Sequence, residues 1–253
     1  MEVQTNKITI DLNLLAAQLR GEISSDLKSL QIIDDAIIQE NYSTNSYTLR
    51  QGFLESTVSI PPPDFLKQRE LNKCFKSIIG SLQDFMDKLI AAMRFSEENI
   101  NLHIGHSKEE LDSIFQKISD LVVNVSTDHS LNIPRKLDII FSNSKNEEIK
   151  VSIQSYFDVR NGLEHHKGIA KIKRLMTYKR LALASTAGYE VTPPAMLGLG
   201  EGLVLKSFSE NIIYDKGGNL IITRTQLDGI ILNLLIFVIP RMIEDVETQL
   251  NHK

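Results

Sequence analysis

The spacing of apolar side chains along the chain predicts a mainly helical protein. In residues 11–40, leucines and isoleucines recur every three or four positions, which is the period of one helix face. Residues 64–98 and 148–165 repeat this spacing with large apolar side chains. A further helix is expected to begin at Ser107, because Ser107 and Glu110 have the spacing of a capping box. We therefore expect a bundle of amphipathic helices.

Several stretches depart from a clear helical period. Residues 41–60 are rich in Ser, Thr, Asn and Tyr and lead into Pro61-Pro62-Pro63, which favours a linker or a structural break. Residues 169–183 still look helical, but apolar and polar residues then alternate on both sides of the Asp-Lys-Gly-Gly turn at 215–218. This pattern predicts a small β-hairpin insertion around residues 203–224. A C-terminal helix should follow from about Thr225, with a kink at Pro240.

Length and composition place these elements in a globular protein. With 253 residues and 42% apolar content, the chain can bury a core of ordinary size. We divide it into an N-terminal helical and linker region of unknown role, residues 1–63, and a helical domain, residues 64–253. The N-terminus lacks the apolar stretch of a secretory signal, and residues 229–240 are too short an apolar run to span a bilayer. We therefore expect a cytoplasmic protein with no membrane contact.

The charge of the whole chain restricts the kind of nucleic-acid site it can carry. The formal net charge is −4, which argues against a surface coated in Lys and Arg for binding duplex nucleic acid. Residues 165–189 nevertheless contain no acidic residue. This segment carries six cations: Lys167, Lys171, Lys173, Arg174, Lys179 and Arg180. It could form a local phosphate site, although a solvated helix face fits the same composition.

Three side chains with phosphate chemistry lie directly before this basic segment. Arg160 offers a planar fork of donors for phosphate oxygens, and His165 can accept or donate a proton near neutral pH. Asn161 and His165 are four residues apart and so are neighbours on a helix. Arg160 lies about 140° away from His165 around a regular helix. Bending of the helix, or a second chain, is needed to bring all three to one point.

The pattern Arg160-Asn161-x-x-x-His165, followed by Gly168-Ile169-Ala170, resembles the HEPN superfamily (higher eukaryotes and prokaryotes nucleotide-binding domain). The resemblance extends more loosely over residues 64–253 and leaves residues 1–63 outside. It implies a helical bundle, with the hairpin as an insertion, that forms a homodimer through the motif helix. The two motif helices would then share one composite cleft.

Many HEPN members resemble metal-independent endoribonucleases of toxin–antitoxin and antiviral defence systems, which implies RNA as substrate and no metal or cofactor. Carried onto this chain, His165 would act as general base or acid, Arg160 would stabilise the charged phosphorus, and Asn161 would orient one of them. The RNA phosphates would contact Lys167, Lys171, Lys173 and Arg174. An antitoxin or a defence-complex protein is a possible partner. Other members keep the fold as non-catalytic nucleotide-binding, RNA-binding or assembly modules, and this alternative stays open.

Two further residues have structural interpretations that compete with chemical ones. His165 and His166 are adjacent, but neighbours on a helix point about 100° apart, which disfavours a metal site. Cys74 is the only cysteine and falls on the apolar face of the helix expected at 64–98, so we expect a buried hydrophobic residue there.

Overall fold

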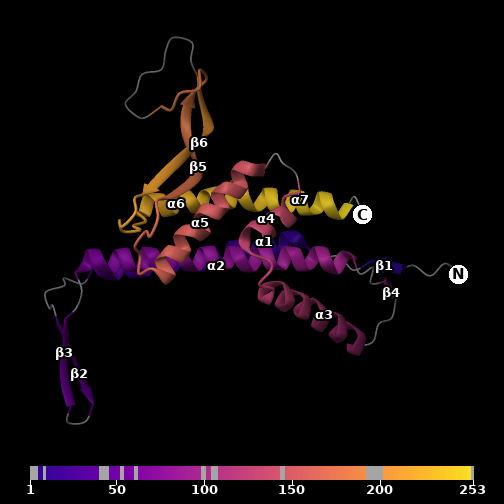
Figure 1. Cartoon of the computed structure of the whole chain (residues 1–253), viewed down its shortest axis with the longest axis horizontal. Helices are drawn as coiled ribbons and strands as arrows, with labels where there is room; N and C mark the ends of the chain where they lie inside the picture. The colour runs from indigo at the N-terminus through magenta and orange to yellow at the C-terminus, as the bar shows by residue number, and fades with distance from the viewer. Residues whose placement is uncertain are drawn as a thin grey trace.

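The computed structural model is mainly helical, with a small antiparallel sheet before the C-terminal helices (Figure 1). This confirms the expected fold class. The structure describes residues 5–7, 10–39, 46–51, 54–59, 62–97, 101–103, 108–142, 146–191 and 202–251.

The centre of the molecule is helix α2, Pro63–Glu97. At 35 residues it is about 52 Å long, and its broad apolar face includes Phe75, Ile79 and Leu82, which are fully buried. Helix α1, Leu12–Gln39, runs beside it (Figure 1). Both helices were expected from the three-and-four spacing of apolar residues. Gly21 lies within α1 without interrupting it, because a single glycine costs only about 1 kcal/mol in a helix.

Helix α1 belongs to the same hydrophobic core as the rest of the chain. Its residues Ala16, Leu19 and Ile23 are buried in the cluster that contains the apolar face of α2. Asp34 on α1 also accepts a hydrogen bond from Arg224, with a distance of 3.1 Å. The division into residues 1–63 and 64–253 stays a prediction, but α1 packs as part of one core with α2.

Three helices follow α2 along the chain. Helix α3, Lys108–Thr127, begins where expected, although its proposed capping residue Ser107 lies outside the described residues. Helix α4, Ile133–Ile140, was not expected. Its local signals are present: Asn132 accepts a hydrogen bond from the Arg135 amide at 3.1 Å, and Pro134 stands in the first turn. Helix α5, Glu147–His165, carries the motif.

The C-terminal part is a helix interrupted by a π-helical turn. Helix α6 spans Arg224–Asn233 and starts with a capping box between Thr223 and Gln226. The π turn, Leu234–Val238, leads into helix α7, Ile239–Asn251. Pro240 lies just after the π turn and has no N–H to donate to the preceding turn, and the kink expected at Pro240 stays a prediction.

Within the described residues, the strands pair in three antiparallel two-stranded sheets. Strand β1, Thr5–Lys7, pairs with β4, Asn101–His103. Strand β2, Ser46–Gln51, pairs with β3, Leu54–Ser59. The second pair lies in the stretch interpreted as a linker, so that interpretation missed a hairpin.

The third sheet corrects the predicted hairpin. Strand β5, Arg174–Ser185, pairs along its whole length with β6, Leu203–Tyr214, and the pair projects from the helices (Figure 1). The helix expected at 169–183 is therefore wrong, as is the pairing of 204–214 with 220–223. Leu, Met and Ala favour helices, but the buried Met176 and Tyr178 follow the two-residue period of a strand.

Candidate functional site

Packing fixes the rotation of the motif helix. Tyr156, Phe157 and Val159 of α5 are buried, and the helix packs against α2 and strand β5. The opposite stripe of α5 is therefore turned outward. Asn161 and His165 both lie on this stripe and are exposed. Because α5 remains helical up to His165, the two side chains are neighbours one turn apart.

Arg160 points in a different direction from His165. Its Nη1 donates a hydrogen bond to Gln83 Oε1 on α2 at 3.2 Å, and its Nη2 lies 3.5 Å from Glu164 Oε1. The Nε atom of Arg160 is buried without a hydrogen-bond partner. One chain thus brings Asn161 and His165 together but leaves Arg160 on another side of the helix, as the regular helical angle requires.

The helix ends directly after the motif. Lys167 and Gly168 have φ angles of 54° and 75°, and the amides of His166 and Gly168 both donate to the carbonyl of Gly162. Two residues in the left-handed region end an α-helix in this way. His165 is therefore the last residue of α5.

The segment that follows is fixed to the turn at residues 215–218. The Ala170 amide donates to the Gly218 carbonyl at 2.9 Å, and the Gly217 amide donates to the Ala170 carbonyl at 2.7 Å. The Leu220 amide also donates to the Gly168 carbonyl at 2.7 Å. The predicted turn thus exists, but it supports the end of the motif helix rather than joining two strands of a hairpin.

Gly162 lies in the closest contact between α5 and this supporting segment. A Cβ atom at Gly162 would lie 2.4 Å from Leu220 Cδ1 and 3.8 Å from Arg174 Nε. Arg174 therefore rests on α5, where its Nη1 is 3.7 Å from Asp158 Oδ1 and its side chain is 14% exposed. Its Nε has no hydrogen-bond partner. The sequence suggested only that glycine loosens the helix, whereas the structure shows that the small residue is needed for packing.

The structure separates the six cations of the basic segment into two groups. Lys167, Lys171 and Lys173 are exposed and make no ion pair with another described residue. The others are neutralised: Arg174 lies beside Asp158, Lys179 pairs with Glu148 at 2.9 Å, and Arg180 pairs with Glu190 at 2.7 Å and Glu210 at 2.9 Å. Among the six cations of this described segment, the three lysines next to the motif therefore remain as free positive charge.

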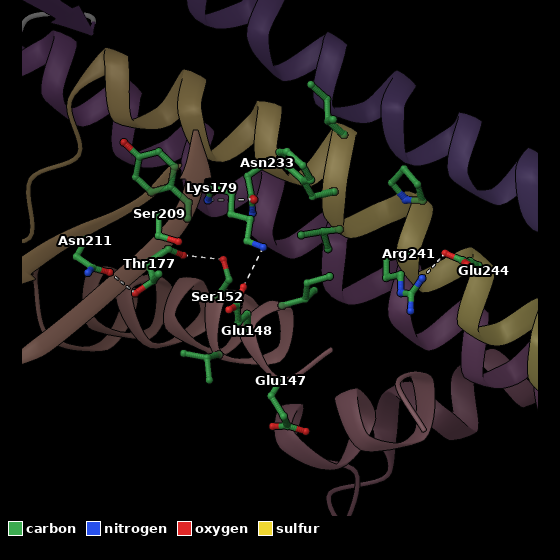
Figure 2. A pocket seen from close by; sticks show the side chains of 17 residues that line it. Glu147, Glu148, Ser152, Thr177, Lys179, Ser209, Asn211, Asn233, Arg241 and Glu244 are labelled. Atoms are coloured by element: carbon green, nitrogen blue, oxygen red, sulfur yellow. Dashed lines mark hydrogen bonds and ion pairs between the residues drawn. The ribbon is translucent and has the colours of Figure 1, made fainter. Parts of the chain in front are cut away.

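A separate cavity of about 660 Å³ lies at the other end of α5 (Figure 2). Its lining comes from the first turns of α5, the base of the β5–β6 hairpin, the π turn and α7. None of the motif residues lines it. Sequence analysis missed this cavity, although the asparagine within an apolar helix at Asn233 and the proline at Pro240 were signals of an irregular segment.

A network of hydrogen-bonded polar side chains, two of which line the cavity, connects α5, α6 and β5. Asn233 is 2% exposed, accepts a hydrogen bond from the Lys179 amide at 3.1 Å and donates to the Tyr156 hydroxyl at 2.8 Å. The hydroxyl of Ser152 donates to the Thr177 carbonyl at 2.6 Å. Burial raises the pKa of Tyr156 well above its ordinary value, so its hydroxyl stays protonated.

Cys74, the other candidate residue from the sequence, has a structural role. Cys74 is buried in the core, and burial raises the pKa of its thiol to about 12, which keeps it unreactive. Within the described residues, no group of three or more His, Cys, Asp or Glu side chains is placed to hold a metal ion. No described helix is both long enough and apolar enough to cross a membrane.

Comparisons with models of known protein families, with curated proteins and with solved structures find no match for this chain.

Proposed function

We propose that this protein is a metal-independent endoribonuclease of HEPN type that acts as a homodimer on RNA. The observation that supports this most directly is the exposed pair Asn161 and His165 at the fixed end of α5. An exposed imidazole, followed in sequence by three lysines that make no ion pair with a described residue, is suited to proton transfer next to a phosphate.

A second copy of the chain would supply what one copy lacks. Val151 and Leu175 are 56% and 50% exposed and line a hollow of about 390 Å³ together with Asp158, on the same side of α5 as His165. Two further apolar side chains after the helix end, Ile169 and Ile172, are 44% and 60% exposed. Exposed apolar residues around a motif favour a protein interface there. Two facing motif helices would place the His165 imidazoles of both copies in one cleft, and Arg160 of either copy would have to release Gln83 and Glu164 to reach it.

The proposed reaction is a transfer of the phosphate within the RNA strand. His165 takes the proton of a ribose 2′-hydroxyl, and the 2′-oxygen attacks the adjacent phosphorus. The bond from phosphorus to the 5′-oxygen breaks, and that oxygen receives a proton from a second acid, such as His165 of the other copy. Arg160 would stabilise the charged phosphorane. The products are a 2′,3′-cyclic phosphate end and a free 5′-hydroxyl.

One observation favours the alternative of a non-catalytic RNA-binding, nucleotide-binding or assembly module. Arg160 is already engaged by Gln83 and Glu164 and must release both contacts to reach a phosphate. A module of this kind would bind RNA through the exposed lysines without cutting it. Involvement of an antitoxin or a defence-complex partner fits either function and remains part of the proposal.

Incubation with total cellular RNA in the presence of EDTA tests the proposal. The wild-type protein should release fragments with cyclic phosphate ends, and His165→Ala should lower the rate by about 100-fold or more, the usual contribution of a general acid or base. His129→Ala is the matched control, because His129 is an exposed histidine outside the motif. Binding of RNA without fragments from the wild type would establish the module instead. Equal cleavage by wild type and His165→Ala would overturn the assignment of His165.

A further inference from the structure

The cavity at the first turns of α5 has the dimensions of a small-molecule site. Its volume of about 660 Å³ falls within the range of about 300–1,000 Å³ that is usual for ligand pockets. It lies outside the motif and contains none of Arg160, Asn161 and His165. It shares Glu147, Val151 and Thr177 with the smaller hollow proposed for the dimer interface, so binding here is tested on residues that belong to this cavity and not to that hollow.

One wall of the cavity is apolar and open to solvent. Its apolar side chains come from the π turn, Pro240 and the first turns of α5. Two of them, Ile236 and Val151, are 43% and 56% exposed. A π turn in a helix is frequently found at functional sites, and here it forms part of the wall. An apolar group entering the cavity would remove these side chains from water.

The opposite wall is held in place by the buried polar network. Asn233 and Ser152 bond to the backbone of β5 at Lys179 and Thr177, which keeps the hairpin base at a fixed distance from α5 and α6. The cavity is thus built into the fold by groups whose hydrogen bonds are already made.

The cavity is lined by two cations and by the carboxylates of Glu147, Glu148 and Glu244, and the cations are the less exposed side chains of their ion pairs. Lys179 from β5 and Arg241 from α7 line it, with side-chain exposures of 34% and 30%. Their partners Glu148 and Glu244 are 78% and 63% exposed. Exposed ion pairs contribute little to stability, so a competing anion can replace these carboxylates at small cost.

We propose that this cavity binds a small amphiphile with an apolar body and an anionic head group. The apolar body lies against Val151, Ile236 and Pro240, and the head group takes the place of Glu148 at Lys179. A carboxylate and a phosphate could both bind the cation in this way. Titration with one probe of each kind distinguishes the two head groups.

Calorimetric titration with octanoate, octyl phosphate and octyltrimethylammonium tests the head group, because all three have the same tail. The proposal expects at least one anionic probe to bind the full chain at least tenfold more tightly than the cationic probe. Tight binding of octyl phosphate alone would assign a phosphate head. Equal affinity for all three, or no binding of either anion, would overturn the proposal.

Substitutions at exposed positions test whether the probe binds in this cavity. Ser209→Trp should fill the cavity and abolish binding, whereas Ser207→Trp should leave it unchanged, since Ser207 is an exposed residue of the same strand outside the lining. Lys179→Gln should weaken binding about tenfold, with Lys206→Gln as the matched control. Folding of each variant is checked by its circular dichroism.

Glu148→Gln separates the proposal from a merely structural role of the ion pair. Removal of the competing carboxylate should tighten binding of the anionic probe two- to fivefold, although it breaks the same ion pair as Lys179→Gln. Weaker binding in Glu148→Gln, or unchanged binding in Ser209→Trp, would contradict the site.

Discussion

At the scale of single residues, Gly162 shows how tightly the end of the motif helix is packed. It is buried in α5, and the buried Leu220 lies where a side chain at Gly162 would extend. An added methyl group must displace the end of Leu220, because the two carbon atoms would be only 2.4 Å apart. Glycine here therefore serves packing between segments far apart in the sequence.

Gly162→Ala is expected to destabilise the protein by about 1–2 kcal/mol. Overpacking costs about 1–3 kcal/mol, and the better helix propensity of alanine returns up to about 1 kcal/mol. Gly21→Ala is the matched control, since Gly21 lies in α1 with nothing within 4 Å of its added Cβ, and it should gain about 0.5–1 kcal/mol. Urea unfolding followed by circular dichroism measures both. A Gly162→Ala protein at least as stable as wild type would refute this role.

The sequence predicts part of the candidate site at this scale. Asn161 and His165 belong to one helix, so their proximity follows from local spacing alone. The hydrogen-bond partner of Arg160 cannot be predicted from local spacing. Gln83 lies 77 positions earlier in the chain and contacts Arg160 only because α2 packs on α5. The contact of Arg174 with Asp158 likewise depends on how β5 crosses the helix.

At the scale of elements, the hairpin base is attached to the helices through side chains. Asn233 accepts the amide of Lys179, and Ser155 accepts the amide of Thr177 at 3.1 Å. These contacts explain why helical sequence reasoning failed for residues 169–183. The helix propensity of Leu, Met and Ala is worth a few tenths of a kcal/mol per residue, which tertiary hydrogen bonds and the pairing with β6 easily exceed.

Asn233→Ala is expected to lower the free energy of unfolding by about 2–4 kcal/mol. The substitution removes the acceptor of the Lys179 amide and the donor to the buried Tyr156 hydroxyl. Each of these lost hydrogen bonds costs about 1–3 kcal/mol. Chemical denaturation gives the total loss, and amide hydrogen exchange at Lys179 should accelerate locally. Asn124→Ala serves as the control at an exposed helical position. A loss no greater than in this control would show that the network is not important.

At the scale of the whole molecule, the structure reduces the free positive charge of the basic segment at residues 167–180 from six side chains to three. Lys167, Lys171 and Lys173 are exposed, while Lys179 and Arg180 already have carboxylate partners. The sequence alone suggested six available charges. The carboxylates that pair with Lys179 and Arg180 lie on α5, on β6 and at residue 190, outside the basic segment, so these ion pairs could not be predicted from it. The expected electrostatic contact with RNA is correspondingly smaller.

The salt dependence of RNA binding should reflect three charges rather than six. For single-stranded RNA, each neutralised phosphate contributes about −0.7 to the slope of log K against log salt, so a slope of about −2 is expected. Lys171→Ala/Lys173→Ala should reduce the magnitude by about 1.4. Arg180→Ala should leave the slope unchanged. Fluorescence anisotropy with a labelled oligonucleotide measures these slopes, and a wild-type value near −4 would contradict this account.

The attachment of β5 also has a consequence for aggregation. A projecting strand normally offers its outward amides and carbonyls to a strand of another molecule. Along β5 four residues already use such groups: Ser155 and Asn233 accept the amides of Thr177 and Lys179, and residues 189–191 bond with Leu183 and Ser185. The hairpin can thus extend into solvent with exposed leucines and still resist edge-to-edge association along β5.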